Sequence, residues 1–333
     1  MKAMTIGDFG GPGVFRVSEL PKPVPGDGQV LIRVAASTVN PIDCKIRSGL
    51  LRALAPETGV LGFDVAGIIE ETGEGVSNFD IGDEVFGCTG AVKEHSGALA
   101  QFQVADARLL ARKPENLSLH EAVALPLVSI TAWDALIRGA KISKGERVLV
   151  HGATGGVGHV GIQLAKNAGA RVYTTVSSKE KAAIARTLGA EPINYKEQSV
   201  EEYVAKFTDG KGFDVVFDTV GGKNLVCSLE AAALEGRVTS VNTRTTADLS
   251  LLHQKALSLH VVFMIIPILH NQPAGLARHG EILREIAGRV ERNQIRPLIH
   301  EQRFPFEQVG SAHALLEEGG ATGKIVLTGF ESS

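Results

Sequence analysis

A glycine-rich stretch, HGATGGVG, occupies residues 151–158. Three glycines within four positions are costly to order, because glycine loses more backbone freedom on folding than any other residue. The stretch follows the apolar run RVLV and precedes a segment with helical periodicity, so we expect it to join a strand to a helix. N–H groups at such a helix start bind phosphate. The pattern A-x-G-G-x-G therefore predicts a loop that cradles a dinucleotide pyrophosphate, although a tight turn with nothing bound has the same pattern. The residues concerned are Ala153, Gly155, Gly156, Val157 and Gly158.

The end of the next strand, RVYTTVS, indicates which dinucleotide is bound. An NAD site places Asp or Glu about 20 residues after the glycines, where the carboxylate holds the ribose hydroxyls. Here Ser177 and Ser178 stand at that place, and Lys179 and Lys181 follow. Hydroxyl and ammonium groups suit a 2′-phosphate, which a carboxylate would repel. The sequence therefore favours NADP(H), and the alternative is an ordinary solvated helix start.

The elements that must position these residues follow two patterns. Over 126–267, β-branched runs alternate with helical periodicity, which predicts βαβ units and a doubly wound parallel sheet of the Rossmann type. Over 1–125, short Val/Ile runs separated by Gly and Asp turn signals predict a mostly-β domain. Residues 268–333, a long amphipathic helix and a short β-like tail, are assigned to that second domain. The predicted fold class is α/β with two domains.

Composition limits the classes of partner. The 333-residue chain has a formal net charge of -3, which gives no general attraction to nucleic acid or to an anionic membrane. The three cysteines, Cys44, Cys88 and Cys227, form no C-x-x-C pair and favour a reducing compartment. The N-terminus lacks the apolar segment of a signal peptide, and the longest apolar run is far shorter than the ~20 residues of a membrane span. We expect a cytoplasmic protein with no membrane span and no nucleic-acid partner.

Seven spaced segments give the chain a resemblance that covers nearly its whole length. The chain resembles the medium-chain dehydrogenase/reductase superfamily, in its zinc-independent quinone oxidoreductase (zeta-crystallin-like) branch. The resemblance implies that the mostly-β domain is a GroES-like catalytic domain. Its carriers are STVNPIDCKIRSG (37–49), GFDVAGIIEETGEGVSNFDIGDEVFG (62–87), SITAWDAL (129–136), HGATGGVG (151–158), INYKEQ (193–198), FDVVFDTVGG (213–222) and GATGKIVL (320–327).

Zinc-dependent members of this superfamily would need metal ligands that the chain lacks. Asn40 occupies the Cys-type ligand position, and Phe63 occupies the His position of the family's GHE motif. The segment PLVSIT offers no cysteine, and a cysteine-rich structural lobe is absent. Zinc sites need about three or four well-placed N, O or S ligands. We therefore predict that the protein binds no metal.

The resemblance also implies roles for residues outside the glycine loop. Asn40 would lie beside the nicotinamide and the substrate, and Asp43 would anchor that loop or shape the pocket, although Asp43 also fits a purely structural turn acid. Thr131 would lie near the nicotinamide, or it caps a buried helix start. Lys181 matches the family's phosphate-binding position better than Lys179.

Four further residues are expected near the cofactor on the same basis. Tyr195 would pack near the adenosine phosphate region, and Asn242 near the nicotinamide-side ribose, although Asn242 also fits an ordinary turn. Phe263 and Lys324 occupy positions that could close over the cofactor. The predicted cofactor site consists of these four residues, the glycine loop, Ser177, Ser178, Lys181, Thr131 and Asn40, and the predicted catalytic residues are Asn40 and Asp43.

The predicted chemistry follows from the missing metal ligands. Without a Lewis acid to stabilise an alkoxide, the favoured hydride acceptors are electron-poor, with charge that delocalises as it forms. The main hypothesis is NADPH-dependent, metal-free hydride transfer to a small-molecule electron acceptor such as a quinone. Two alternatives stay open: an enoyl or 2-alkenal reductase acting on α,β-unsaturated carbonyls, and a catalytically silent NADPH-binding protein.

The apolar run LHVVFMII (259–266) is expected to be the terminal strand of the parallel sheet. An exposed apolar edge strand invites pairing with another chain. Relatives dimerise by joining such edges, so we predict a homodimer through this strand.

Overall fold

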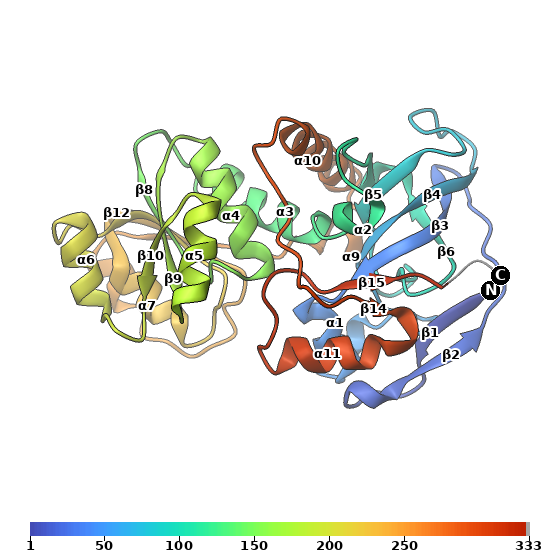
Figure 1. The fold of residues 1–333 in the computed structure, drawn as a ribbon, viewed down its shortest axis with the longest axis horizontal. Coiled ribbons are helices and arrows are strands. Elements are labelled where there is room, and N and C mark those ends of the chain that lie inside the picture. Colours follow the sequence, from blue (N-terminus) through green and yellow to red (C-terminus); the bar gives the residue numbers. More distant parts are fainter. Residues whose placement is uncertain (331–333) are drawn as a thin grey trace. The chain divides into compact units, whose positions relative to one another are not determined.

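The structure is a computed structural model that describes residues 1–330. The chain divides into two compact units (Figure 1). Unit 1 comprises Met1–Leu127, Ile265–Asn293 and residues 297–330, and unit 2 comprises Val128–Met264 and Gln294–Arg296. The units are described in turn.

Unit 2 contains a six-stranded sheet in which every neighbouring pair is parallel, in the order β10-β9-β8-β11-β12-β13. The chain moves outward from β8 through β9 to β10 and then returns to β11 on the other side of β8, which is the doubly wound topology. Ligands of such sheets bind beyond the carboxyl ends of the strands, where the order reverses. The strands are β8 (Arg147–Val150), β9 (Arg171–Val176), β10 (Glu191–Asn194), β11 (Phe213–Asp218), β12 (Ala232–Ser240) and β13 (Ser258–Val261).

The helices of unit 2 pack in pairs: α4 contacts α5, and α6 contacts α7. The strands between them read as apolar runs because both faces of a parallel sheet are covered; Val148, Leu149 and Val150 of β8 are fully buried. The helices are α3 (Pro126–Trp133), which begins two residues before the unit, α4 (Gly156–Asn167), α5 (Lys179–Leu188), α6 (Val200–Thr208), α7 (Asn224–Ala231) and α8 (Ser250–Gln254). A π-helical turn, Asp134–Gly139, follows α3.

The edge strand β13 is shorter than predicted. It ends at Val261, and the prediction of a strand over 259–266 is wrong beyond that residue. The N–H of Val262 still bonds to Ser240, but the side chain of Val262 is only 5% exposed, so the apolar run turns into the core. Pro267, which has no N–H for a strand ladder, stands in the first turn of the short helix α9 (Ile266–Leu269).

Unit 1 is built around a seven-stranded sheet of order β14-β15-β3-β4-β5-β7, in which β6 also pairs with β3. A separate antiparallel pair is formed by β1 (Lys2–Ile6) and β2 (Phe15–Glu19). The strands of the sheet are β3 (Gln29–Thr38), β4 (Asp64–Thr72), β5 (Glu84–Cys88), β6 (Phe102–Asp106), β7 (Leu110–Arg112), β14 (Phe304–Pro305) and β15 (Val326–Thr328). The helices are α1 (Pro41–Arg47), α2 (Leu119–Ala122), α9, α10 (Pro273–Glu291) and α11 (Val309–Glu317).

The central strand of this sheet is β3, which pairs with β4, β6 and β15. It brings together segments from both ends of the chain, because β15 lies almost 300 residues after β3 in the sequence. Two residues after β3 ends, Asn40 is the N-cap of α1. The two α/β units agree with the predicted fold class.

One stretch, Leu119–Gly139, is long and apolar enough by length and composition to cross a membrane. Its most apolar window is 78% buried inside the protein, as in the core helices of soluble proteins. This is weak support for a membrane span.

Candidate functional site

A cavity of ≈ 420 Å³ opens in unit 2 among the loops that follow β8, β9, β10 and β11. Four predicted cofactor residues line it: Ala153, Ser177, Lys181 and Tyr195. The other lining residues are His151, Gly152, Thr154, Thr175, Val176, Gln198, Ser199, Val200, Tyr203, Val220, Asn224 and Cys227. The cavity lies where a doubly wound sheet binds a nucleotide.

The glycine loop has the shape of a phosphate cradle. Gly155 is the N-cap of α4, and no side chain caps this helix start, so the N–H groups that follow are left for another partner. The other predicted loop residues, Gly156, Val157 and Gly158, form its first turn. A Cβ on Gly158 would lie 2.0 Å from the carbonyl oxygen of Gly152, so only glycine fits at this position. A dinucleotide pyrophosphate fits this arrangement.

The charge of the cavity suits a second phosphate, beside Ser177 and Lys181. Ser177 and Lys181 line it, and within residues 1–330 no Asp or Glu side chain does. The hydroxyl of Ser178 accepts a hydrogen bond from the backbone N–H of Lys181 at 3.3 Å and caps α5, so it serves the helix. This cap fixes the helix turn from which Lys181 projects.

Several lining residues were not identified from the sequence. The hydroxyl of Thr175 lies 3.2 Å from both the N–H of Gly152 and Nδ1 of His151, so it ties the end of β9 to the glycine loop. Asn224 donates to Asp218 at 2.8 Å, and the same carboxylate accepts the N–H of Gly221 at 2.9 Å. Thr175 is the last residue but one of β9 and Asn224 is the first residue of α7, and neither position differs in the sequence from an ordinary polar residue.

His151 lies behind the glycine loop and is 3% exposed. Burial lowers the pKa of its imidazole to about 4, against the opposing effect of the Asp218 carboxylate. The ring is therefore neutral at pH 7.

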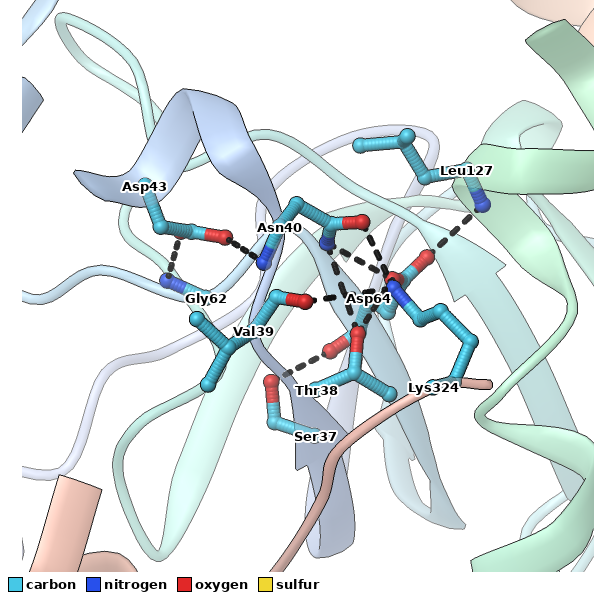
Figure 2. Close-up of polar contacts among 9 residues, drawn as sticks. All are labelled: Ser37, Thr38, Val39, Asn40, Asp43, Gly62, Asp64, Leu127 and Lys324. Carbon is cyan, nitrogen blue, oxygen red and sulfur yellow. Dashed lines mark hydrogen bonds and ion pairs between the residues drawn. The ribbon is translucent and has the colours of Figure 1, made fainter. Parts of the chain in front are cut away.

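Unit 1 holds a second group of predicted residues, which Figure 2 shows together: Asn40, Asp43 and Lys324. Asn40 is the N-cap of α1, and its backbone N–H donates to Oδ2 of Asp43 at 2.9 Å. Oδ1 of Asp43 accepts the N–H of Gly62 at 3.1 Å, so this carboxylate links the start of α1 to the segment before β4. These contacts fit the structural alternative for Asp43, and its predicted catalytic role stays a prediction.

The carboxyl group of Asp43 is fully buried, and this burial raises its pKa to about 7. The hydrogen bonds from Asn40 and Gly62 act in the opposite direction, while the neighbouring charge of Asp64 raises the pKa further. Removal from water disfavours the charged form of a carboxyl group, which is the larger effect here.

The centre of this group is Asp64, the first residue of β4, which is fully buried. Oδ2 of Asp64 accepts from the hydroxyl of Thr38 at 2.6 Å, from Nδ2 of Asn40 at 2.9 Å and from Nζ of Lys324 at 3.2 Å. Oδ1 accepts the N–H of Leu127 at 2.7 Å. Asp64 was not among the predicted site residues, because its partners are far from it in the sequence.

The remaining predicted residues belong to unit 2. Thr131 lies inside α3 and is 5% exposed, so it does not begin that helix. Asn242 follows β12, and its carbonyl oxygen accepts the N–H of Gly222 at 3.1 Å. Phe263 follows β13 and is 45% exposed. The structure therefore places Asn242 near the carboxyl edge of the sheet, outside the cavity lining.

Lys324 differs from the expected cofactor contact. Its ammonium group lies 2.6 Å from Oδ1 of Asn40, 3.2 Å from Asp64 and 3.5 Å from the carbonyl oxygen of Val39, which engages all three of its donors. Phe63, at the predicted metal-ligand position, is fully buried. Within the described part of the chain, no group of three or more His, Cys, Asp or Glu side chains is arranged to hold a metal ion.

Comparison with known proteins matches both units. Residues 26–115 match the alcohol dehydrogenase GroES-like domain, and residues 188–327 match a family described as zinc-binding dehydrogenase. Human quinone oxidoreductase is 33% identical over 332 residues, covering 98% of this chain and 97% of that protein. The chain belongs to the medium-chain dehydrogenase/reductase family. The predicted family and fold class, a GroES-like unit with a Rossmann unit, are thereby confirmed.

Two further relatives of this dehydrogenase/reductase chain are informative. A chloroplastic NADPH-dependent alkenal/one oxidoreductase of Arabidopsis thaliana is 31% identical, covering 98% of this chain and 79% of that protein. A crystal structure of an alcohol dehydrogenase superfamily protein from Novosphingobium aromaticivorans is 40% identical, with a TM-score of 0.93, and covers 98% of this chain and 99% of that one. These relatives indicate that the chain is an oxidoreductase of this family.

Proposed function

We propose that the protein transfers hydride from NADPH, without a metal, to a quinone or another electron-poor acceptor. The observation that carries the choice of NADPH is the unit 2 cavity, which presents Lys181 and Ser177 and, among residues 1–330, no carboxylate. An NAD site would place a carboxylate there for the ribose hydroxyls. Bound NADPH would supply the hydride, and the residues of the chain bind and orient it.

The roles of the chain's own residues follow from their positions. The uncapped start of α4 holds the pyrophosphate, and Lys181 with Ser177 holds the 2′-phosphate. We assign Asn40 to the reacting end, where its amide donates a hydrogen bond to the oxygen on which negative charge develops. Donors aimed at developing charge are a common source of rate enhancement.

The residues at the family's metal positions support the metal-free part of the proposal. Asn40 and the buried Phe63 stand where zinc-dependent members have ligands, and a phenyl ring cannot bind zinc. Elemental analysis of the purified protein should find no stoichiometric zinc. About one zinc per chain, lost together with activity on chelation, would contradict this part.

The reduction of α,β-unsaturated carbonyls is a second candidate, favoured by the alkenal/one oxidoreductase among the relatives. Both acceptors delocalise the charge that hydride addition creates. The deciding experiment is steady-state oxidation of NADPH against a panel of quinones, enones, alkenals and simple ketones. Turnover of quinones or enones but not ketones supports the proposal. Tight NADPH binding with no turnover on any acceptor would indicate a silent binding protein.

We also propose a cytoplasmic homodimer joined through the edge of the parallel sheet. Strand β13 ends this sheet, and Val261 at its end is 51% exposed. Pairing of two such edges would cover the exposed residue and continue the ladder of hydrogen bonds.

A further inference from the structure

The side-chain amide of Asn40 is bound at both ends by charged groups (Figure 2). Its Oδ1 accepts from the ammonium of Lys324 at 2.6 Å, and its Nδ2 donates to the carboxylate of Asp64 at 2.9 Å. The ammonium and the carboxylate also pair with each other at 3.2 Å. The three side chains thus close a ring of contacts.

This ring permits only one orientation of the amide. Lys324 can only donate, and ionised Asp64 can only accept. A flipped Asn40 would place its NH₂ against the ammonium and its oxygen against the carboxylate, which is unfavourable at both ends. The hydroxyl of Thr38, which donates to Asp64 at 2.6 Å, holds the carboxylate in place from the side.

The second amide hydrogen of Asn40 is held only weakly. The first Nδ2 hydrogen is engaged by Asp64, while the contact of Nδ2 with Thr38 is long at 3.4 Å. A ligand oxygen can therefore take over the second hydrogen. The ammonium on Oδ1 polarises the amide and makes that hydrogen a stronger donor, because hydrogen bonds in a chain strengthen one another.

We propose that the Asp64–Lys324 ion pair is a positioning device that fixes and polarises the Asn40 amide toward the hydride acceptor. This inference rests on the proposed function. Lys324 and Asp64 are positioning residues that act through Asn40, and Lys324 does not bind the cofactor directly. Asn40, Asp64 and Lys324 are all buried, and the ammonium of Lys324 contacts Val39, Asn40 and Asp64, which is consistent with an indirect role.

The first test is a double-mutant cycle with Lys324→Met and Asn40→Ala. Because Lys324 acts through Asn40, each single variant should lower kcat with the best acceptor by about 10- to 100-fold, the loss of a charge-assisted hydrogen bond. The double variant should be no slower than Asn40→Ala alone. The NADPH dissociation constant should stay within about twofold of wild type in all three.

Lys113→Met is the matched control. Lys113 pairs with Glu84 at 3.0 Å, has a side chain that is 11% exposed, and belongs to the same unit but not to this ring. It should leave kcat unchanged. Multiplicative losses in the double variant, or weaker NADPH binding by Lys324→Met, would overturn the proposal. Inactive wild-type protein would instead refute the proposed function.

A second measurement does not depend on turnover. It also keeps the proposal testable if Lys324→Met fails to fold. The double variant Asp64→Asn/Lys324→Met removes both charges beside Asn40, and Lys324→Gln keeps a neutral donor beside the Asp64 carboxylate. The side-chain amide signals of Asn40, identified by their loss in Asn40→Asp, should exchange slowly with solvent in wild type without acceptor. The exchange rate should rise at least tenfold in the double variant. It should rise by less in Lys324→Gln, which keeps one donor. Unchanged exchange in both variants would show that the ion pair does not position the amide.

Discussion

Replacing Lys181 by alanine tests the assignment of the phosphate end of the cavity. Lys181 and Ser177 both line the cavity, and no carboxylate among residues 1–330 lines it with them. A hydrogen bond between an ammonium and a phosphate contributes roughly 1.5–3 kcal/mol. Lys181→Ala should therefore raise the NADPH dissociation constant by about 10- to 100-fold. Affinity for NADH, which has no 2′-phosphate, should stay nearly constant. Titration of each cofactor by nucleotide fluorescence measures both constants.

Lys179 provides a control in the same helix turn. It is the first residue of α5, is exposed and does not line the cavity, so Lys179→Ala removes an equal charge at a short distance. Because salt screens a charge that does not touch the phosphate, Lys179→Ala should change the NADPH dissociation constant much less than Lys181→Ala does. Ser177→Asp should go further than Lys181→Ala and favour NADH. Equal weakening of NADPH and NADH by Lys181→Ala, or wild-type binding of NADH as tight as that of NADPH, would refute the reasoning.

Three further predictions follow from other parts of the structure. Gly158→Ala would place a methyl group 2.0 Å from the oxygen of Gly152, so it should abolish measurable NADPH binding in the same titration, whereas Gly13→Ala, with open space at its Cβ and no left-handed backbone, should not. Burial lowers the pKa of His313 from 6.5 to about 3, so the folded state resists protonation of this imidazole. The free energy of unfolding therefore has the full contribution of neutral His313 above pH 6.5. As the pH falls toward 3, this free energy drops by up to roughly 5 kcal/mol. Urea unfolding at pH 7 and pH 4.5 should therefore show a smaller acid-induced loss for His313→Gln than for wild type; equal losses would contradict this. Val261→Lys, at the exposed end of β13, should convert the dimer to monomer in light scattering at micromolar concentration, and a wild-type monomer would rule out the dimer itself.

The cofactor loop could be predicted from the sequence because its determinants are local. A β-branched run, a cluster of glycines and a periodic segment follow one another within about 20 residues, and the structure has β8, the loop and α4 in that order. Lys181 and Ser177 were found by their distance from the end of β9, which parallel topology fixes. The sequence could not identify Gln198 or Asn224, because polar residues after strands are common and few of them face a ligand.

The ring around Asn40 could not be predicted because its members are distant in the chain. Asp64 lies 24 residues from Asn40, 63 from Leu127 and 260 from Lys324. No periodicity or spacing connects such positions, so the sequence did not single out Asp64. The end of β13 was missed for a related reason: Val262 looks like a strand residue, but packing in three dimensions turns its side chain inward.

The long separation between Asp64 and Lys324 has a consequence for synthesis on the ribosome. At roughly 5–20 residues per second, an emerging chain waits on the order of 13–50 s between the two residues. During that time the carboxylate of Asp64 has no cation to accompany it into the interior, so unit 1 cannot finish its core. Unit 2 is nearly continuous from Val128 to Met264 and can fold while the ribosome is still at work. The nascent chain therefore gains its nucleotide cavity first, and the closing of the ring around Asn40 is among the last steps of its maturation.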